Sequence, residues 1–233
     1  MPIPHNALSL AQVGIFEGVP ADTLSKYIHV NTHRRGEYVF HAGDPADTVF
    51  VLLDGVVKKT YINPGGDEKI ISVIQRGDVF GHLFLGKYRY RISSAMILSE
   101  ATIGRVSESH LYSLIEQYPR VGIALIRYYA DEQRETLARL HALMHLDAQQ
   151  RLLGTLLYLA RRYCCSDGIW FNLPPGLSQE DIANIACLNR STVSLLINDL
   201  RRQAILGGKG RWLTINRQAV EDMLRAAGVE ILE

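Results

Sequence analysis

The sequence predicts an α+β protein in three parts: a β-roll or jelly roll over residues 1–118, one long helix over 119–146, and a winged helix-turn-helix over 147–233. Three observations support this prediction. Segments rich in Val, Ile, Tyr and Phe lie between residues 37 and 106 and are separated by glycines. A heptad pattern without internal breaks follows. Two short capped helices and a glycine-rich hairpin come last.

The composition is that of an ordinary globular protein. Of the 233 residues, 47% are hydrophobic and 21% are charged, and the net charge is +1. A nearly neutral chain can bind nucleic acid only through a local basic surface. No apolar run reaches the length of a membrane span, and the start "MPIPHNALSL" lacks the basic and apolar regions of a signal peptide. We therefore expect a cytoplasmic protein with no membrane partner.

The cysteines argue against covalent or metal-based scaffolding. Cys164, Cys165 and Cys187 are the three cysteines of the chain, two of them are adjacent, and no CxxC pair is present. This count excludes an iron–sulfur cluster held by four thiolates, and the spacing favours neither a disulfide framework nor a zinc site. We expect no bound metal from these residues.

The β-rich part reads as closely spaced strands joined by tight turns. Glycines at 36, 43, 55, 65, 66, 77 and 81 separate the strands, and "NPGGD" (63–67) has the composition of a hairpin tip. The last stretch, "DVFGHLFLGKYRYRISSA" (78–95), begins as a strand that ends at Gly81 and continues through a loop with a single histidine, His82. What this loop holds depends on its place in the fold.

The predicted long helix carries a coiled-coil seam. Pro119 suits the first turn of a helix, and no proline and no glycine after Gly122 interrupts the helix up to Leu146. Six residues at alternating spacings of three and four would form a seam along one face of this helix, which predicts a homodimer. They are Ile126, Tyr129, Gln133, Thr136, Leu140 and Leu143. The alternative is a helix that packs only on its own domain. Gln133 and Thr136 either set the register of the seam or reach a ligand beside it.

The C-terminal part has the signals of a DNA-reading element. Asp147 and Gln150 form a predicted capping box, which places a domain boundary at Asp147. A second capping signature begins at Ser178, and Asn189 is expected to cap the following helix, "RSTVSLLINDLRRQ". Residues 178–217 contain six Lys or Arg and three Asp or Glu, so this segment is basic although the chain is nearly neutral. The alternative is a helical hairpin with solvated charges.

The residues expected to contact double-stranded DNA lie on these helices and on the predicted wing. An arginine in the first turn of the second helix can pair with guanine in the major groove, and basic residues of the wing suit phosphates. The predicted set is Ser178, Gln179, Asn189, Arg190, Ser191, Thr192, Ser194, Arg201, Lys209 and Arg211.

The order of roll, long helix, Asp hinge and winged helix-turn-helix resembles the Crp/Fnr family over roughly residues 10–217. The stretches that carry the resemblance are "GDVFG", "HLDAQQR" and "LSQEDIANIACLNRSTVSLLINDL". The resemblance implies a cyclic-nucleotide-binding-like roll and a homodimer that binds palindromic promoter sites and recruits or blocks RNA polymerase. In the recognition helix Arg190 matches the cyclic-AMP-binding members, whereas Ser191 and Leu195 depart from them.

The effector pocket departs further from that pattern. The resemblance implies a pocket of Gly81, His82, Arg91, Ser93, Ser94 and Thr136. His82 stands where cyclic-nucleotide binders have a ribose-binding Glu, and Ser93 stands where they have a phosphate-binding Arg. Thr136 matches the adenine-contacting Thr, and Arg91 lies two residues before Ser93. We therefore expect no cyclic AMP binding of the usual kind: the pocket takes another effector or is filled by its own side chains.

Several alternatives remain open from the sequence. Haem-based gas sensors of the same family use a histidine of this region or the N-terminus, and both His82 and Pro2 are present. The effector or cofactor is therefore unassigned. A nucleotide-binding regulatory module without DNA function is a further alternative. His141 and His145 lie four residues apart, but no third metal ligand accompanies them. No nucleophile–base pair or phosphate loop indicates an enzyme.

Overall fold

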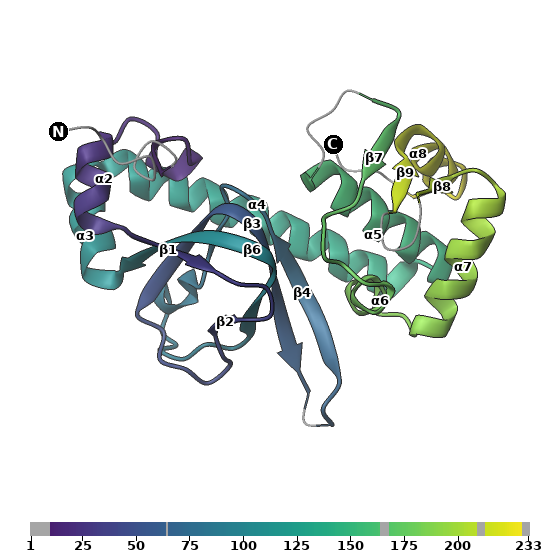
Figure 1. Ribbon diagram of the computed structural model, residues 1–233, viewed down its shortest axis with the longest axis horizontal. Helices are drawn as coiled ribbons and strands as arrows, with labels where there is room; N and C mark the ends of the chain where they lie inside the picture. The colour runs from purple at the N-terminus through teal and green to yellow at the C-terminus, as the bar shows by residue number, and fades with distance from the viewer. Residues whose placement is uncertain (1–9, 64, 164–167, 209–212, 230–233) are drawn as a thin grey trace. The chain divides into compact units, whose positions relative to one another are not determined.

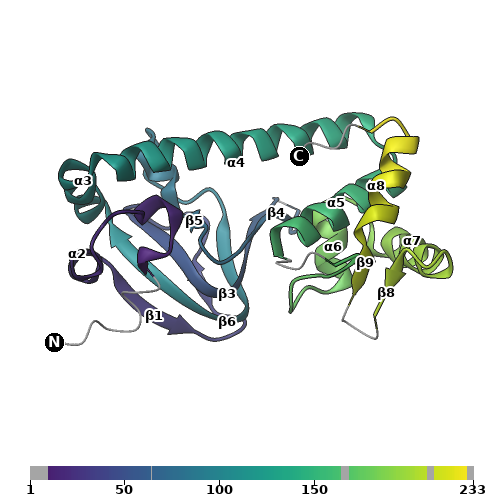
Figure 2. The ribbon, with the colours of Figure 1, turned by 90° about the horizontal axis from the view of Figure 1, so that it is seen from above.

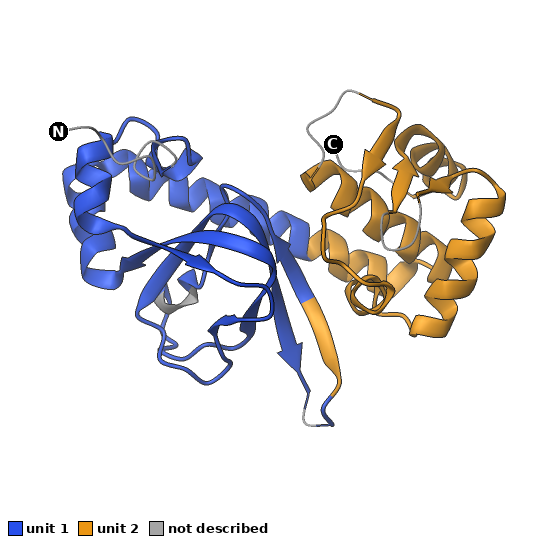
Figure 3. Cartoon of the chain, in the orientation of Figure 1, with its two compact units in different colours: residues 1–66, 71–136 blue, residues 67–70, 137–233 orange. Residues whose placement is uncertain are grey.

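The computed structural model describes residues 10–63, 65–163, 168–208 and 213–229. The chain divides into two compact units, residues 1–66 with 71–136 and residues 67–70 with 137–233, which Figure 3 shows in separate colours. In the described part of the chain, no helix is both long and apolar enough to cross a membrane. Cys164, Cys165, Lys209 and Arg211 lie outside the described residues.

The first unit is a β-roll with helices against one face of its sheet (Figure 1). The sheet order is β1-β6-β3-β4, β2 also pairs with β6, and β5 pairs with β3. The strands of this sheet are β1 His29–His33, β2 Tyr38–Phe40, β3 Thr48–Ile62, β4 Glu68–Ile74, β5 Val79–Phe80 and β6 Ser94–Ser107, and residues 68–70 of β4 are counted with the second unit. Its helices are η1 Gly14–Phe16, α2 Ala21–Tyr27, η2 His82–Leu85, α3 Glu108–Gln117 and the first part of α4 Pro119–His145. The predicted roll is confirmed, although β1 precedes the region in which strands were expected.

Alternation along β3 builds two cores, one on each face of the sheet. Val49 and Val51 point to a core shared with the helices, which includes Val121 and Leu125 of α4. Phe50 and Leu52 point to the interior of the roll. Figure 2 shows α4 beside the roll, as this first core requires.

Gly55 allows β3 to follow the curvature of the roll. Its φ is +92°, and a Cβ at this position would lie 2.3 Å from the carbonyl oxygen of Glu100 on the neighbouring strand. The β3–β6 register also shifts on either side of it, between Leu52 and Val57. A residue without a side chain is required where two bent strands approach this closely.

The second unit is a small α+β domain. Its elements are α5 Ala148–Tyr163, β7 Trp170–Asn172, α6 Gln179–Ala186, α7 Arg190–Arg202, β8 Leu206–Gly207, β9 Thr214–Asn216 and α8 Arg217–Ala226. β8 and β9 pair antiparallel, which confirms the predicted hairpin, and β7 adds a third strand beside β9. The core combines one face of every helix with the small sheet: Leu152, Leu156, Ile182, Val193, Ile197, Ile215, Val220 and Leu224 are all buried.

Candidate DNA-binding element and sensor pocket

The α6–α7 pair begins with a complete capping box. The Ser178 hydroxyl accepts a hydrogen bond from the Asp181 backbone N–H at 3.1 Å, and the Asp181 carboxylate accepts from the Ser178 N–H at 2.9 Å. α6 ends at Cys187, a non-glycine residue with φ +53° in the left-handed region. The chain therefore turns sharply into α7, which starts at Arg190. This is the geometry of a helix-turn-helix.

The exposed side of α7 carries the residues that the sequence selects for DNA. Val193, Ile197 and Leu200 are buried against the domain, and Leu196 is half-buried. Arg190 and Ser191 are exposed at the first turn, and Thr192 and Ser194 are half-buried beside them: these four predicted residues lie together.

Asn189 behaves differently from its prediction. It occupies the N-cap position of α7, but its side chain makes no capping hydrogen bond and is exposed. The prediction that the Asn189 side chain caps α7 by a hydrogen bond is therefore wrong. Because no side chain caps this terminus, the first N–H groups of α7 still require an acceptor.

The arginines at the two ends of α7 form ion pairs that are exposed to solvent. The side chain of Arg190 is 71% exposed, and its Nε lies 3.8 Å from a Glu180 carboxylate oxygen. At the other end, Arg202 lies 3.0 Å from Asp199 and is equally open to solvent. Exposed pairs of this kind contribute at most about 1 kcal/mol, so either arginine can exchange its partner for an anionic ligand at little cost.

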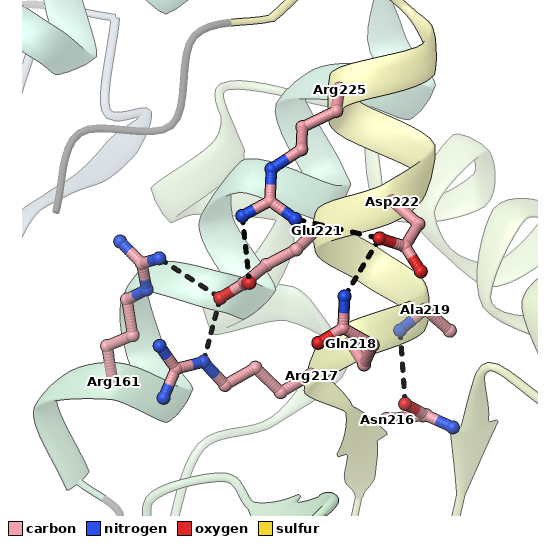
Figure 4. Close-up of polar contacts among 8 residues, drawn as sticks. All are labelled: Arg161, Asn216, Arg217, Gln218, Ala219, Glu221, Asp222 and Arg225. Carbon is pink, nitrogen blue, oxygen red and sulfur yellow. Dashed lines mark hydrogen bonds and ion pairs between the residues drawn. The ribbon is translucent and has the colours of Figure 1, made fainter.

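The buried carboxylate of Glu221 links α8 to α5, next to the α6–α7 pair (Figure 4). Glu221 accepts from Arg161 at 3.0 Å and from Arg217 at 2.7 Å, and Arg225 lies at 3.4 Å. Burial raises the pKa of Glu221, but hydrogen bonds from Arg217 and Arg161 outweigh it and hold that pKa below its ordinary value. No pattern in the sequence indicated this cluster.

In the first unit, Arg91 is occupied by the roll itself. Its guanidinium donates to the carbonyl oxygens of Gly81 and, at 2.7 Å, of Thr48. It also stacks 4.5 Å from the ring centroid of Phe40. Burial lowers the pKa of Arg91 from its ordinary value. Gly81 has φ +75°, and a Cβ there would lie 2.8 Å from the Arg91 guanidinium, so these two predicted pocket residues fit each other.

The remaining predicted pocket residues do not converge on one cavity. Ser93 and Ser94 are buried, and the Ser94 hydroxyl accepts from the Ala42 N–H at 2.9 Å, a bond that holds a loop of the roll. Thr136 is exposed, and its hydroxyl donates to the carbonyl oxygen of Glu132 one turn earlier in α4. The structure therefore brings Gly81 and Arg91 together but leaves Thr136 on the surface of α4.

His82 anchors a charged cluster that the sequence analysis missed. Its Nε2 lies 2.9 Å from Glu132 Oε2, and Lys59 Nζ lies 3.4 Å from Glu132 Oε1. The Tyr129 ring packs edge-on against the His82 ring at 4.5 Å, and its hydroxyl donates to the His82 carbonyl oxygen. The one available signal was spacing: Glu132 follows Tyr129 by three residues and so shares its helix face.

The His82 and Lys59 side chains stabilise the ionised form of Glu132. Burial raises the pKa of Glu132, but the hydrogen bond with His82 and the positive charge of Lys59 outweigh it and hold that pKa at about 2. Burial also raises the pKa of Tyr129. Both ring nitrogens of His82 are buried, and Nε2 is the one that faces the Glu132 carboxylate.

α4 exposes an apolar stripe that only partly follows the predicted seam. Among the predicted residues, Ile126, Gln133, Thr136, Leu140 and Leu143 are exposed, but Tyr129 packs on His82 of its own chain. The exposed large apolar side chains are Ile123, Ile126, Leu137, Leu140, Leu143 and Met144. Ile123, Leu137 and Met144 were not part of the predicted seam.

His141 and His145 lie on the same helix with ring centroids 4.7 Å apart. Within the described residues, no group of three or more His, Cys, Asp or Glu side chains is placed to hold a metal ion.

Comparison with known proteins identifies both parts of the chain. A cyclic nucleotide-binding domain matches residues 30–118, and a Crp-like helix-turn-helix domain matches residues 150–223. The chain belongs to the Crp/Fnr family. It is a transcriptional regulator of that type, as the resemblance in its sequence predicted.

Relatives and solved structures agree with this assignment. The regulator is 29% identical over 210 residues to the CRP-like cAMP-activated global transcriptional regulator of Mycobacterium tuberculosis, covering 89% of this chain and 94% of the relative. It is 28% identical over 192 residues to the global nitrogen regulator of Nostoc sp., covering 81% and 85%.

Among solved structures, FixK2 from Bradyrhizobium japonicum shares its fold with a TM-score of 0.75 at 24% identity, over 88% of this chain and 99% of that one. A CRP-family transcriptional regulator from Thermus thermophilus has a TM-score of 0.70 at 25% identity, over 87% and 98%.

Proposed function

We propose that this regulator is a cytoplasmic homodimer that binds a palindromic double-stranded DNA site through α7 and acts on RNA polymerase. Residues 147–233 form the DNA-binding domain, residues 119–146 the dimerisation helix and residues 1–118 a sensor domain. The observation that carries the proposal is the exposed first turn of α7, where Arg190, Ser191 and Thr192 follow an N-terminus without a side-chain cap.

The DNA contacts follow from this arrangement. Arg190 is exposed and its ion pair with Glu180 is long, at 3.8 Å, so its guanidinium is available to the major-groove edge of guanine. The N–H groups of the first turn of α7, which the Asn189 side chain does not cap, suit a backbone phosphate. Arg201 at the end of α7, with Lys209 and Arg211 of the wing, supplies further phosphate contacts.

Dimerisation follows from the exposed stripe of α4. Six large apolar side chains along one helix are costly to leave in water, and a second copy of the same helix buries them with two-fold symmetry. A two-fold dimer presents two copies of α7, which matches the two half-sites of a palindrome.

The sensor domain does not bind cyclic AMP in the usual way, according to this proposal. A nucleotide phosphate needs a charge-assisted partner, and Arg91 already donates to two carbonyl oxygens inside the roll. His82, in the position of the ribose-binding residue, faces Glu132 instead. The haem alternative gains no support, because the His82 Nε2 that would bind iron faces the same carboxylate. Calorimetry that detects micromolar binding of cyclic AMP or cyclic GMP would contradict this part.

The DNA part is tested by comparing two arginines of α7. The full-length protein first selects its site from a random DNA pool, and affinities for the selected and a scrambled sequence are then measured by fluorescence anisotropy. Arg190→Ala should weaken binding to the selected site by about 1–3 kcal/mol and relax the preference at one base pair.

Arg202→Ala is the matched control, because Arg202 is equally exposed on the same helix but lies at its far end. It should leave the base preference unchanged. If Arg190→Ala weakens the selected and scrambled sequences equally, Arg190 contacts phosphate and the proposed docking of α7 is wrong.

A further inference from the structure

The Lys59–Glu132–His82 cluster has the layout of a ligand site whose occupant comes from the chain itself. The two nitrogen-bearing side chains lie deep, with 12% of the Lys59 side chain and 2% of the His82 side chain exposed. The carboxylate between them is 27% exposed. Each carboxylate oxygen faces one of the two side chains, Oε1 facing Lys59 and Oε2 facing His82. The site therefore has a buried floor that binds a carboxylate and an outer layer formed by that carboxylate.

The three residues differ in their freedom to move. Lys59 extends from β3, in the middle of the sheet, and His82 begins η2 directly after β5, with its ring packed by Tyr129. Glu132 is attached to the surface of a helix and is already partly in water. Rotation of the Glu132 side chain restores its full hydration. Lys59 and His82 would stay buried and would lack the acceptor that the carboxylate provides. The carboxylate is thus the component that leaves at the lowest cost.

Other contacts hold α4 when the carboxylate leaves. The Tyr128 hydroxyl donates to the Val79 carbonyl oxygen at 2.9 Å, and the Tyr129 hydroxyl donates to the His82 carbonyl oxygen at 2.9 Å. Both bonds are independent of Glu132. The site can therefore open without separating the helix from the roll.

We propose that Lys59 and His82 form a binding site for a small organic carboxylate, and that Glu132 occupies this site until such a ligand displaces it. The proposal rests on the proposed function of this domain as a sensor and names the chemical class of its effector. The ligand exchanges one carboxylate for another, so the buried Lys59 and His82 keep their partners throughout. What changes is α4, which loses the Glu132 contact with the roll while the Tyr128 and Tyr129 hydrogen bonds remain.

The test removes the internal occupant and supplies its equivalent. Glu132→Ala deletes a CH₂–COO⁻ group, which acetate replaces. Thermal unfolding of the full-length protein is followed against sodium acetate, with sodium chloride at equal ionic strength as the reference, and binding is confirmed by calorimetry. The variant should show saturable stabilisation by acetate with a dissociation constant of roughly millimolar order, because so small a ligand makes few contacts.

Two controls make the result specific. The wild type and Asp131→Ala, which removes an exposed carboxylate one residue away, should respond to acetate at least about tenfold more weakly. Adding Lys59→Met to the Glu132→Ala protein should abolish the response. No saturable response in Glu132→Ala, or an equal response after Lys59→Met, would overturn the proposal.

A second variant covers the case in which Glu132→Ala does not fold. Glu132→Gln keeps the shape of the side chain but lacks the charge, so acetate should compete with it far better than with the wild type. Equal acetate affinity in the Gln variant and the wild type would also overturn the proposal. DNA selection by the wild type is scored separately. A protein that selects no sequence would refute the proposed function and leave the acetate result standing.

Discussion

Leu140→Asp tests whether the exposed stripe of α4 is a dimer seam. Leu140 is 52% exposed within its own chain, so about half of the 1.5–3 kcal/mol available from burying a leucine, roughly 1 kcal/mol per protomer, remains to be gained. The substitution removes this gain and places an unpaired carboxylate in the seam, at a cost of several kcal/mol per ion. Two copies per dimer give a total of about 6 kcal/mol or more, which raises the dissociation constant about 10⁴-fold.

Sedimentation equilibrium at micromolar concentration measures this effect. The variant should be monomeric and should lose most of its affinity for the palindromic site. Its own fold should be preserved, because the side chain faces solvent in the single chain and the helix-propensity cost is only about 0.7 kcal/mol. Tyr88→Asp, which introduces the same charge at an exposed position of the roll, should remain a dimer. An unchanged dimer in the Leu140 variant would refute the seam.

Three further predictions concern single sites. Arg91→Met should destabilise the protein by about 2–4 kcal/mol in chemical denaturation, because the carbonyl oxygens of Thr48 and Gly81 lose their donor, whereas the exposed Arg89→Met should leave stability nearly unchanged. The pKa of Glu132 in the folded protein is about 2, below its ordinary 4.5, so its contribution to the free energy of unfolding is complete above pH 4.5 and is lost as the pH falls toward 2. Glu132→Gln should remove that part of the stability–pH profile, and an unchanged profile would contradict the charged cluster. Ser178→Ala should cost about 1 kcal/mol through the lost cap, as thermal unfolding would show, whereas Ser191→Ala should leave stability nearly unchanged.

Local signals in the sequence predicted the capped elements correctly. The boxes at Asp147 and Ser178 involve residues three apart, and both form as expected, with Asp147 and Gln150 exchanging hydrogen bonds at 2.9 and 3.0 Å. Such bonds depend only on the backbone that carries both residues, so the sequence contains all the information they need. The cap at Asn189 failed because a side chain in the N-cap position can also turn to solvent.

The core pattern was predictable for a similar reason. Alternation in β3 and the three- and four-residue spacing in α7 determine which side chains face inward, whatever lies opposite. The same spacing selected the apolar stripe of α4 but did not predict the contact of Tyr129 with the roll. A tyrosine suits a helix seam and a domain contact equally well, and only the folded chain shows its hydroxyl on the His82 carbonyl oxygen.

The sequence by itself determined the order of roll, long helix and helix-turn-helix, because periodicity, capping and turn chemistry act over a few residues. Only the tertiary structure decided which side chains meet between the roll and α4. Lys59, His82 and Glu132 come from β3, η2 and α4, and no local pattern links three polar side chains so far apart in the chain. Their meeting depends on how the sheet curves and where the helix packs on it. Electrostatic interactions of this kind follow distance in space, which the sequence does not state.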